Sequence, residues 1–158
     1  MPKYYYKKKY YYRGSRDKYS VEQTVGSATT AAEGATTSQV IVPPATFQGM
    51  RKVKHLTISM GTGGAGSGSM LLWALVYVPE GTVPGALNYV SGGASVLYNP
   101  NQFVMGCGIF DFDAGPQRVH CPLSRNLNSG DQIMLLVRGL DSVGINYTYV
   151  VRYAITLQ

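Results

Sequence analysis

The clearest structural signal in the chain lies near its end, which reads Tyr147-Thr148-Tyr149-Val150-Val151-Arg152-Tyr153-Ala154-Ile155-Thr156-Leu157. Large apolar side chains occupy every second position, and threonine and arginine fall between them. Because side chains alternate between the two faces of a β-strand, this pattern predicts a strand with one buried face. No stretch of about 12 residues shows a convincing helical period, so the pattern favours an all-β protein.

Further strands are predicted upstream of this one. Residues 56–60 alternate in the same way, and the unbroken apolar run 70–78 is typical of a strand covered on both faces. Shorter strands are expected at residues 39–42, 103–110, 117–121 and 132–137, the second of them interrupted at Gly106 or Gly108. Glycine-rich and proline-rich loops separate them, at 61–69 and 79–100. Seven or eight strands with such loops indicate an antiparallel sandwich or barrel.

The charge of the chain is concentrated at its beginning. Residues 1–20 hold seven of the 14 cations and one of the eight anions, so the entire net charge of +6 lies there. The remaining 138 residues are neutral and carry 14 charges, about 10% against the roughly 25% of ordinary soluble domains. Interface cores between proteins are depleted of charge in this way. We therefore expect a basic arm at residues 1–19 and, at 20–158, a β domain that belongs to an assembly.

The arm interleaves blocks of lysine with blocks of tyrosine. Cations pair with phosphates, and tyrosine rings stack on unpaired bases, so the pattern favours single-stranded nucleic acid. A solvated tail or a nuclear import signal would also account for the lysine block at 7–9. A second cationic cluster precedes the strand at 56–60. The candidate nucleic-acid-binding residues are Lys3, Tyr4, Tyr5, Tyr6, Lys7, Lys8, Lys9, Tyr10, Tyr11, Tyr12, Arg13, Arg16, Lys18, Arg51, Lys52 and Lys54.

Other chemistry has little support in the sequence. Asp111 and Asp113 lie on the same side of a strand, but turn and capping roles explain them better than a divalent metal does. No serine stands in a nucleophile elbow, and we expect no catalytic residue, no metal site and no cofactor. Cys107 and Cys121 are expected to be free thiols. The charged beginning of the chain and its longest apolar run of nine residues predict neither a signal peptide nor a membrane helix.

Four segments of the domain, taken with the basic arm before them, carry a family resemblance. They are Arg51-Lys52-Val53-Lys54, Leu97-Tyr98-Asn99-Pro100-Asn101-Gln102-Phe103-Val104-Met105-Gly106, Leu123-Ser124-Arg125-Asn126-Leu127-Asn128-Ser129-Gly130-Asp131 and Val151-Arg152-Tyr153-Ala154-Ile155. In their order the chain resembles the capsid proteins of small circular single-stranded DNA viruses that encode a replication initiator, the circovirus-like group. The arm departs from the arginine-rich arms common in that group, being short and rich in lysine and tyrosine.

The resemblance implies a single eight-stranded antiparallel jelly roll, a β-sandwich with a basic N-terminal arm. It implies about 60 copies in a small icosahedral T=1 shell, a single-stranded DNA genome inside it, and a subunit found in the virion and, during assembly, the host nucleus. Nuclear import machinery is a further expected partner, and a membrane is not. Two alternatives remain: a single-stranded nucleic-acid-binding β-barrel that forms no shell, and a secreted glycan-binding β-sandwich. The second is disfavoured because a signal peptide is not expected.

Overall fold

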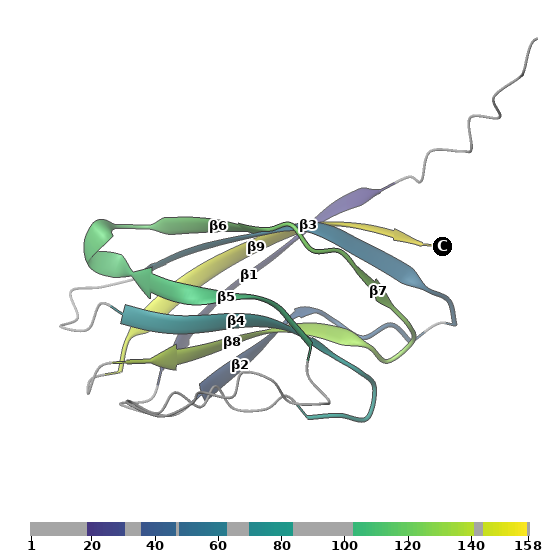
Figure 1. Ribbon diagram of the computed structural model, residues 1–158, viewed down its shortest axis with the longest axis horizontal. Helices are drawn as coiled ribbons and strands as arrows, with labels where there is room; N and C mark the ends of the chain where they lie inside the picture. The colour runs from purple at the N-terminus through teal and green to yellow at the C-terminus, as the bar shows by residue number, and fades with distance from the viewer. Residues whose placement is uncertain are drawn as a thin grey trace, which may run out of the picture.

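The computed structural model of the protein describes residues 19–30, 36–46, 48–62, 70–83, 103–140 and 144–157, and it is an antiparallel β structure (Figure 1). Eight main strands and a short ninth form it, with one 3₁₀ turn. They are β1 (Ser20–Thr29), β2 (Thr36–Val42), β3 (Arg51–Thr62), β4 (Met70–Val78), β5 (Phe103–Asp111), η1 (Phe112–Ala114), β6 (Gln117–Cys121), β7 (Arg125–Leu127), β8 (Gln132–Gly139) and β9 (Asn146–Leu157).

Two sheets pack face to face. Sheet A has the order β1-β9-β3-β6, with the three-residue β7 also paired to β3, and sheet B has the order β2-β8-β4-β5. Strands of the first half of the chain pair with strands of the second half in nested fashion: β1 with β9, β2 with β8, β3 with β6, and β4 with β5. This nested pairing, wound into two sheets, is a jelly roll. The predicted fold class is confirmed, and β7 is the addition to the eight expected strands.

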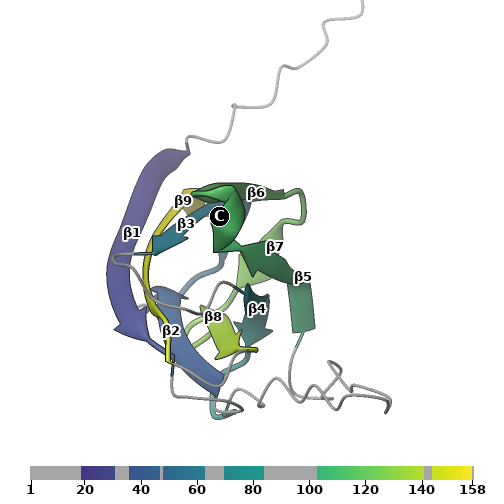
Figure 2. The same cartoon turned by 90° about the vertical axis from the view of Figure 1, so that its left-hand side faces the viewer.

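The core lies between the sheets, which curve around it in the end-on view of Figure 2. Leu56 and Ile58 from β3 meet Trp73 and Leu75 from β4, and all four are nearly or fully buried. The predicted alternation in β9 is confirmed, because its tyrosines and aliphatic residues at 147–155 point inward in every second position.

β4 is buried on both faces, as its continuous apolar sequence predicts. Trp73 and Leu75 point into the sandwich, while Ala74 and Val76 point outward and are also fully buried. The outward residues pack with Leu136 of β8 in a second, smaller apolar cluster on the outer face of sheet B.

The expected interruption of the strand at 103–110 does not occur. β5 runs without a break from Phe103 to Asp111, and only its register against β4 shifts, between Leu75 and Val76. Gly108 lies opposite Trp73, and a Cβ there would lie 3.1 Å from the indole Nε1. The glycine makes room for a large neighbour instead of ending the strand.

A bulge divides β3 into two halves of opposite phase. The pairing with β9 shifts between Lys54 and Thr57, and His55 has a φ of 57°, in the left-handed region. One extra residue in a strand reverses which positions face inward. Val53 therefore points into the core before the bulge and Leu56 after it, which leaves Lys52 and Lys54 on the outer face of sheet A.

Candidate nucleic-acid interface

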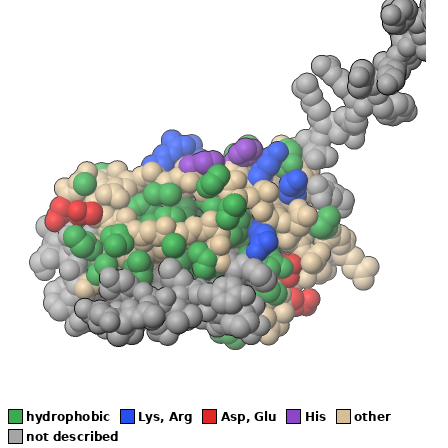
Figure 3. All heavy atoms as spheres, in the orientation of Figure 1, with side chains coloured by type: hydrophobic (Ala, Val, Ile, Leu, Met, Phe, Trp, Pro, Cys, Tyr) green, Lys and Arg blue, Asp and Glu red, His purple; other side chains and the backbone are tan. Residues whose placement is uncertain are grey.

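The outer face of sheet A carries cations and no described carboxylate. Residues that pair across neighbouring strands share a face, so the register places Arg152 of β9, Thr57 of β3 and His120 of β6 in one row. We define the basic face as Lys52, Lys54, His55, Arg118, His120 and Arg152. Figure 3 shows lysine, arginine and histidine side chains along the side of the molecule that sheet A forms. Charges of one sign gathered on one surface attract polyanions.

Polar side chains between the cations complete this surface. The rings of His55 and His120 stack with centroids 6.3 Å apart, and Nδ1 of His120 lies 3.2 Å from the Thr57 hydroxyl oxygen. Nε of Arg152 donates to Oε1 of Gln23 at 2.9 Å. The contact with Gln23 orders the Arg152 side chain, and no acid of the described residues on this face compensates the charge of its lysines and arginines.

The arm joins the domain at the basic face. Tyr19 is the first described residue, and the Nζ of Lys54 lies 3.5 Å from the centroid of its ring. The candidate residues from Lys3 to Lys18 lie outside the described residues, so their role remains a prediction. The contact between Tyr19 and Lys54 nevertheless fixes where the chain leaves the domain.

Arg51 is separated from the other two cations of its predicted cluster. It precedes the bulge on the same side as Val53, is 7% exposed, and its guanidinium donates to the carbonyl oxygens of Pro43, at 2.9 Å, and Asp131, at 3.5 Å. Only Lys52 and Lys54 of the cluster therefore reach the basic face. Sequence reasoning also missed Arg118, because the pairing of Arg118 with Ser59 is visible only in the register.

The other residues considered as candidates for metal binding or thiol chemistry, two aspartates and two cysteines, form no such site in the described part of the chain. The carboxylate of Asp111 accepts the backbone N–H of Asp113 at 3.1 Å and caps η1, the role predicted for it. Among the described residues, no group of three or more His, Cys, Asp or Glu side chains could hold a metal ion. Cys107 is exposed, Cys121 is buried, and both are free thiols.

Among the described residues, no helix has the length and apolar character needed to cross a membrane.

The strand order and the basic face together define a jelly-roll β-sandwich with a cationic surface, an architecture that viral capsid domains share with lectins and cupins. No protein-family model matches the chain, and no curated protein matches it. The resemblance to circovirus-like capsid proteins therefore remains a prediction.

Solved structures offer distant similarities. A structure of infectious bursal disease virus, Gt strain, has 11% identity and a TM-score of 0.46, covering 90% of this chain and 32% of that one. A structure of the Gx strain has 9% identity and a TM-score of 0.40, and the match covers 89% of this chain and 32% of that one. The structure of the Yersinia pseudotuberculosis-derived mitogen has 12% identity and a TM-score of 0.40, and the match covers 87% of this chain and 86% of that one. The chain spans about a third of the length of the two viral chains. The jelly-roll assignment rests on the strand order and not on these similarities.

Proposed function

We propose that the protein is a viral capsid subunit that self-assembles into a small icosahedral shell and packages single-stranded DNA. The observation that carries this proposal is the segregation of charge. All of the net charge lies in the arm, the arm joins the domain beside Lys54, and the face around Lys54 has cations and no described carboxylate. A subunit that holds a polyanion on one side needs this arrangement.

The proposed partners are other copies of the chain, about 60 in a closed shell, and the genome. Closed point-group assembly is the rule for homo-oligomers, and the low charge content of residues 21–158 favours surfaces that neighbours cover. The virion is the proposed location. Entry into the host nucleus through the lysine block at 7–9 is proposed on the arm sequence alone.

A single-stranded nucleic-acid-binding protein that forms no shell is the second candidate. Such proteins stack bases on aromatic side chains of one domain face. Here Tyr147, Tyr149 and Tyr153 are 1%, 4% and 3% exposed and point into the core, so they offer no stacking surface. Their burial favours the capsid subunit over this alternative.

Negative-stain microscopy of the purified protein, combined with the 260/280 nm absorbance ratio of the same fraction, tests the proposal. We expect uniform round particles with a raised ratio. Small unassembled species with a raised ratio would instead support the second candidate, and a protein that stays monomeric across salt and pH would overturn the shell.

Removal of residues 1–18 separates the two candidates further, because it leaves Tyr19 on Lys54 and takes away every charged side chain of the arm. A capsid subunit should still form particles, with an absorbance ratio clearly below that of the full-length particles. A domain-face binder should retain most of its affinity for a labelled oligonucleotide.

A further inference from the structure

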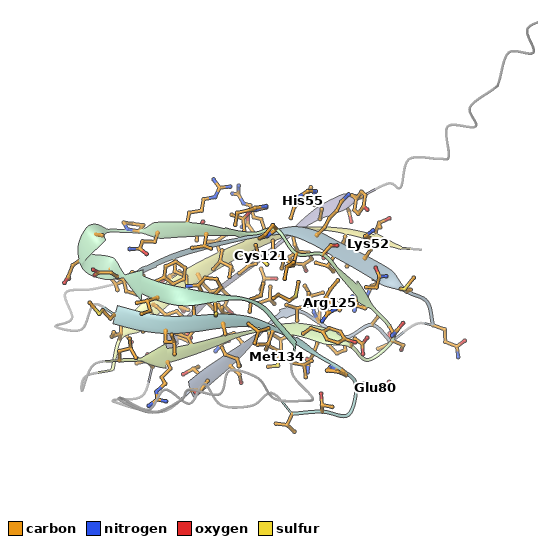
Figure 4. The ribbon with its side chains drawn as sticks, in the orientation of Figure 1. Lys52, His55, Glu80, Cys121, Arg125 and Met134 are labelled. Atoms are coloured by element: carbon orange, nitrogen blue, oxygen red, sulfur yellow. The ribbon has the colours of Figure 1, made fainter. Side chains whose placement is uncertain are left out.

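A cleft of about 460 Å³ opens on the surface where β7 lies beside β3 and the end of β4 passes beneath them. This volume lies in the range of roughly 300–1,000 Å³ that is usual for small-ligand sites. Its lining residues are Lys52, Tyr77, Pro79, Ser124, Arg125 and Asn126. Figure 4 shows Lys52 and Arg125 toward the same end of the sandwich.

The lining of the cleft holds two cations and no carboxylate. Two carboxylates lie in its surroundings: exposed Glu80, which follows Pro79 and lies against Gly130, and Asp131, which is committed to the protein. Asp131 is 4% exposed and does not line the cleft. Its carboxylate accepts the Tyr77 hydroxyl at 2.7 Å and the backbone N–H groups of Asn128 and Glu80 at 2.8 and 3.1 Å. With three donors satisfied by the protein, the Asp131 carboxylate holds the wall of the cleft in place and presents no free oxygen to a ligand.

Tyr77 forms a fixed aromatic wall. The hydrogen bond to Asp131 fixes its hydroxyl end, and the guanidinium carbon of Arg125 lies 5.1 Å from its ring centroid. Burial, followed by the hydrogen bond to Asp131, raises the pKa of Tyr77 to about 12, so the phenol is neutral at physiological pH. Because the guanidinium lies over the ring, a base that enters the cleft can stack on the planar guanidinium and contact the part of the Tyr77 ring that lines the cleft.

The cleft continues the basic face. Lys52 belongs to both, because it points outward from β3 and pairs with Asn126 of β7, and Lys54 lies two residues further along the same strand. On the outer face, Lys54, which contacts Tyr19, and Lys52 therefore lead to the cleft. Arg125 pairs with Val53 on the inner side of sheet A and lines the same cleft from that side. By the strand register, no described acidic side chain stands on the outer face of β3 between Lys54 and Lys52.

We propose that the cleft binds one nucleotide unit of a single-stranded nucleic acid, with the phosphodiester between Lys52 and Arg125 and the base against Tyr77. Ser124 and Asn126 supply a hydroxyl and an amide to hydrogen-bond the base or the sugar. The inference deepens the proposed function, since the packaged genome is the source of the nucleotide, and it places a contact on the folded domain in addition to the arm.

Photo-cross-linking of the full-length protein tests the site. The probe is a short oligothymidylate with one 4-thiothymidine, and cross-linked peptic peptides are identified by mass spectrometry. We expect a cross-link in the peptide that contains Tyr77 as well as cross-links in the arm. Lys52→Gln and Arg125→Gln should each reduce the Tyr77 cross-link by about fivefold, the effect of removing about 1 kcal/mol of binding.

Arg138→Gln is the matched control, because Arg138 is a cation on the outer face of sheet B, away from the cleft. It should leave the Tyr77 cross-link and the arm cross-links unchanged. Circular dichroism of each variant verifies folding, and Lys52→Gln, at a half-buried surface position, keeps the test decisive should Arg125→Gln unfold.

Three results would overturn the inference. Cross-links confined to the arm would refute the cleft and leave the proposed function intact. A wild-type cleft without cross-links, together with loss of particles in Arg125→Gln, would show that the cleft receives an acidic group of a neighbouring copy instead. Absence of cross-links everywhere would refute nucleic-acid packaging along with the cleft.

Discussion

The two outer faces of the sandwich differ more than any other pair of regions in the molecule. The outer face of sheet A is polar and basic, with Lys54, Arg118 and Arg152 on it. The middle of the outer face of sheet B is apolar, with Ala74 and Leu136 0% and 1% exposed, and Arg138 lies outside this apolar cluster. The strands of both sheets alternate inward and outward, so the difference lies entirely in what stands at the outward positions.

The contrast shows how one fold separates two tasks. The inward positions of both sheets build a single core and are fixed by packing. The exposed outward positions of sheet A are free of that constraint and suit a polyanion, while the outward positions in the middle of sheet B are apolar and buried in a cluster of their own. Function in this protein is therefore to be sought at outward positions and at the ends of the sandwich, where the cleft lies.

The largest effect is expected from truncating an outward residue of sheet B. Leu136→Ala should lower the free energy of unfolding by about 3 kcal/mol, because it removes a fully buried side chain and leaves a cavity. Thr148→Ala, at an exposed outward position of β9, should change it by less than about 0.5 kcal/mol. Chemical denaturation of unassembled subunits, followed by Trp73 fluorescence, gives both values. Equal losses of unfolding free energy in the two variants would show that the outer faces of the two sheets do not differ in packing.

The next effect concerns the charge of the basic face. Lys54→Gln combined with Arg152→Gln should weaken oligonucleotide binding about tenfold near 0.1 M salt and reduce the slope of log K against log salt by about 1.4, because single strands contribute roughly 0.7 per phosphate contact. Fluorescence anisotropy across a salt series measures this slope. Arg138→Gln on sheet B should leave the slope unchanged, and an equal effect of Arg138→Gln would mean that only total charge matters.

Much of this contrast was predictable from sequence, and the rest depended on register. The periodicity of residues 56–60 and 147–157 predicted β3 and β9, and the apolar run 70–78 predicted both buried faces of β4. The bulge at His55 was not predictable, because no glycine or proline marks it. That single extra residue decides that Lys52 and Lys54 point outward while Arg51 is buried.

β1 and the composition of the basic face were missed for different physical reasons. β1 is an edge strand with mostly exposed side chains, so it has no apolar alternation to recognise. Arg118 and Arg152 are far apart in sequence and share one face only because β6 and β9 both pair with β3. Pairing between distant strands depends on the whole fold and leaves no local pattern.

A smaller effect on the free energy of unfolding is expected from Tyr77 of β4, which lines the cleft. Tyr77→Phe should lower the free energy of unfolding by about 1–2 kcal/mol, since it removes a hydrogen bond to the carboxylate of Asp131 and leaves that buried group with two donors. Denaturant titration at pH 7 measures the loss. A change below about 0.5 kcal/mol would show that the Asp131 carboxylate does not depend on Tyr77.

The smallest effect on the free energy of unfolding is expected from Tyr147 in β9 of sheet A. Tyr147 is 1% exposed, and its hydroxyl has no hydrogen-bond partner in the described part of the chain. Tyr147→Phe removes an unsatisfied buried group and should leave the stability at pH 7 unchanged or raise it by up to about 1 kcal/mol. A loss of more than about 1 kcal/mol would mean that the hydroxyl is satisfied after all.

Alkaline pH gives a second test of the buried phenol of Tyr147. Burial raises the pKa of Tyr147 to about 12, against about 10 for an unfolded chain. The folded state then holds the proton more tightly than the unfolded state, so the stability is complete below pH 10 and falls as the pH rises toward 12. Tyr147→Phe should therefore make the decline between pH 10 and 12 shallower, as measured by denaturation at each pH. The same decline in the variant and the wild type would assign it to other groups, among them Tyr77, whose pKa is also raised to about 12.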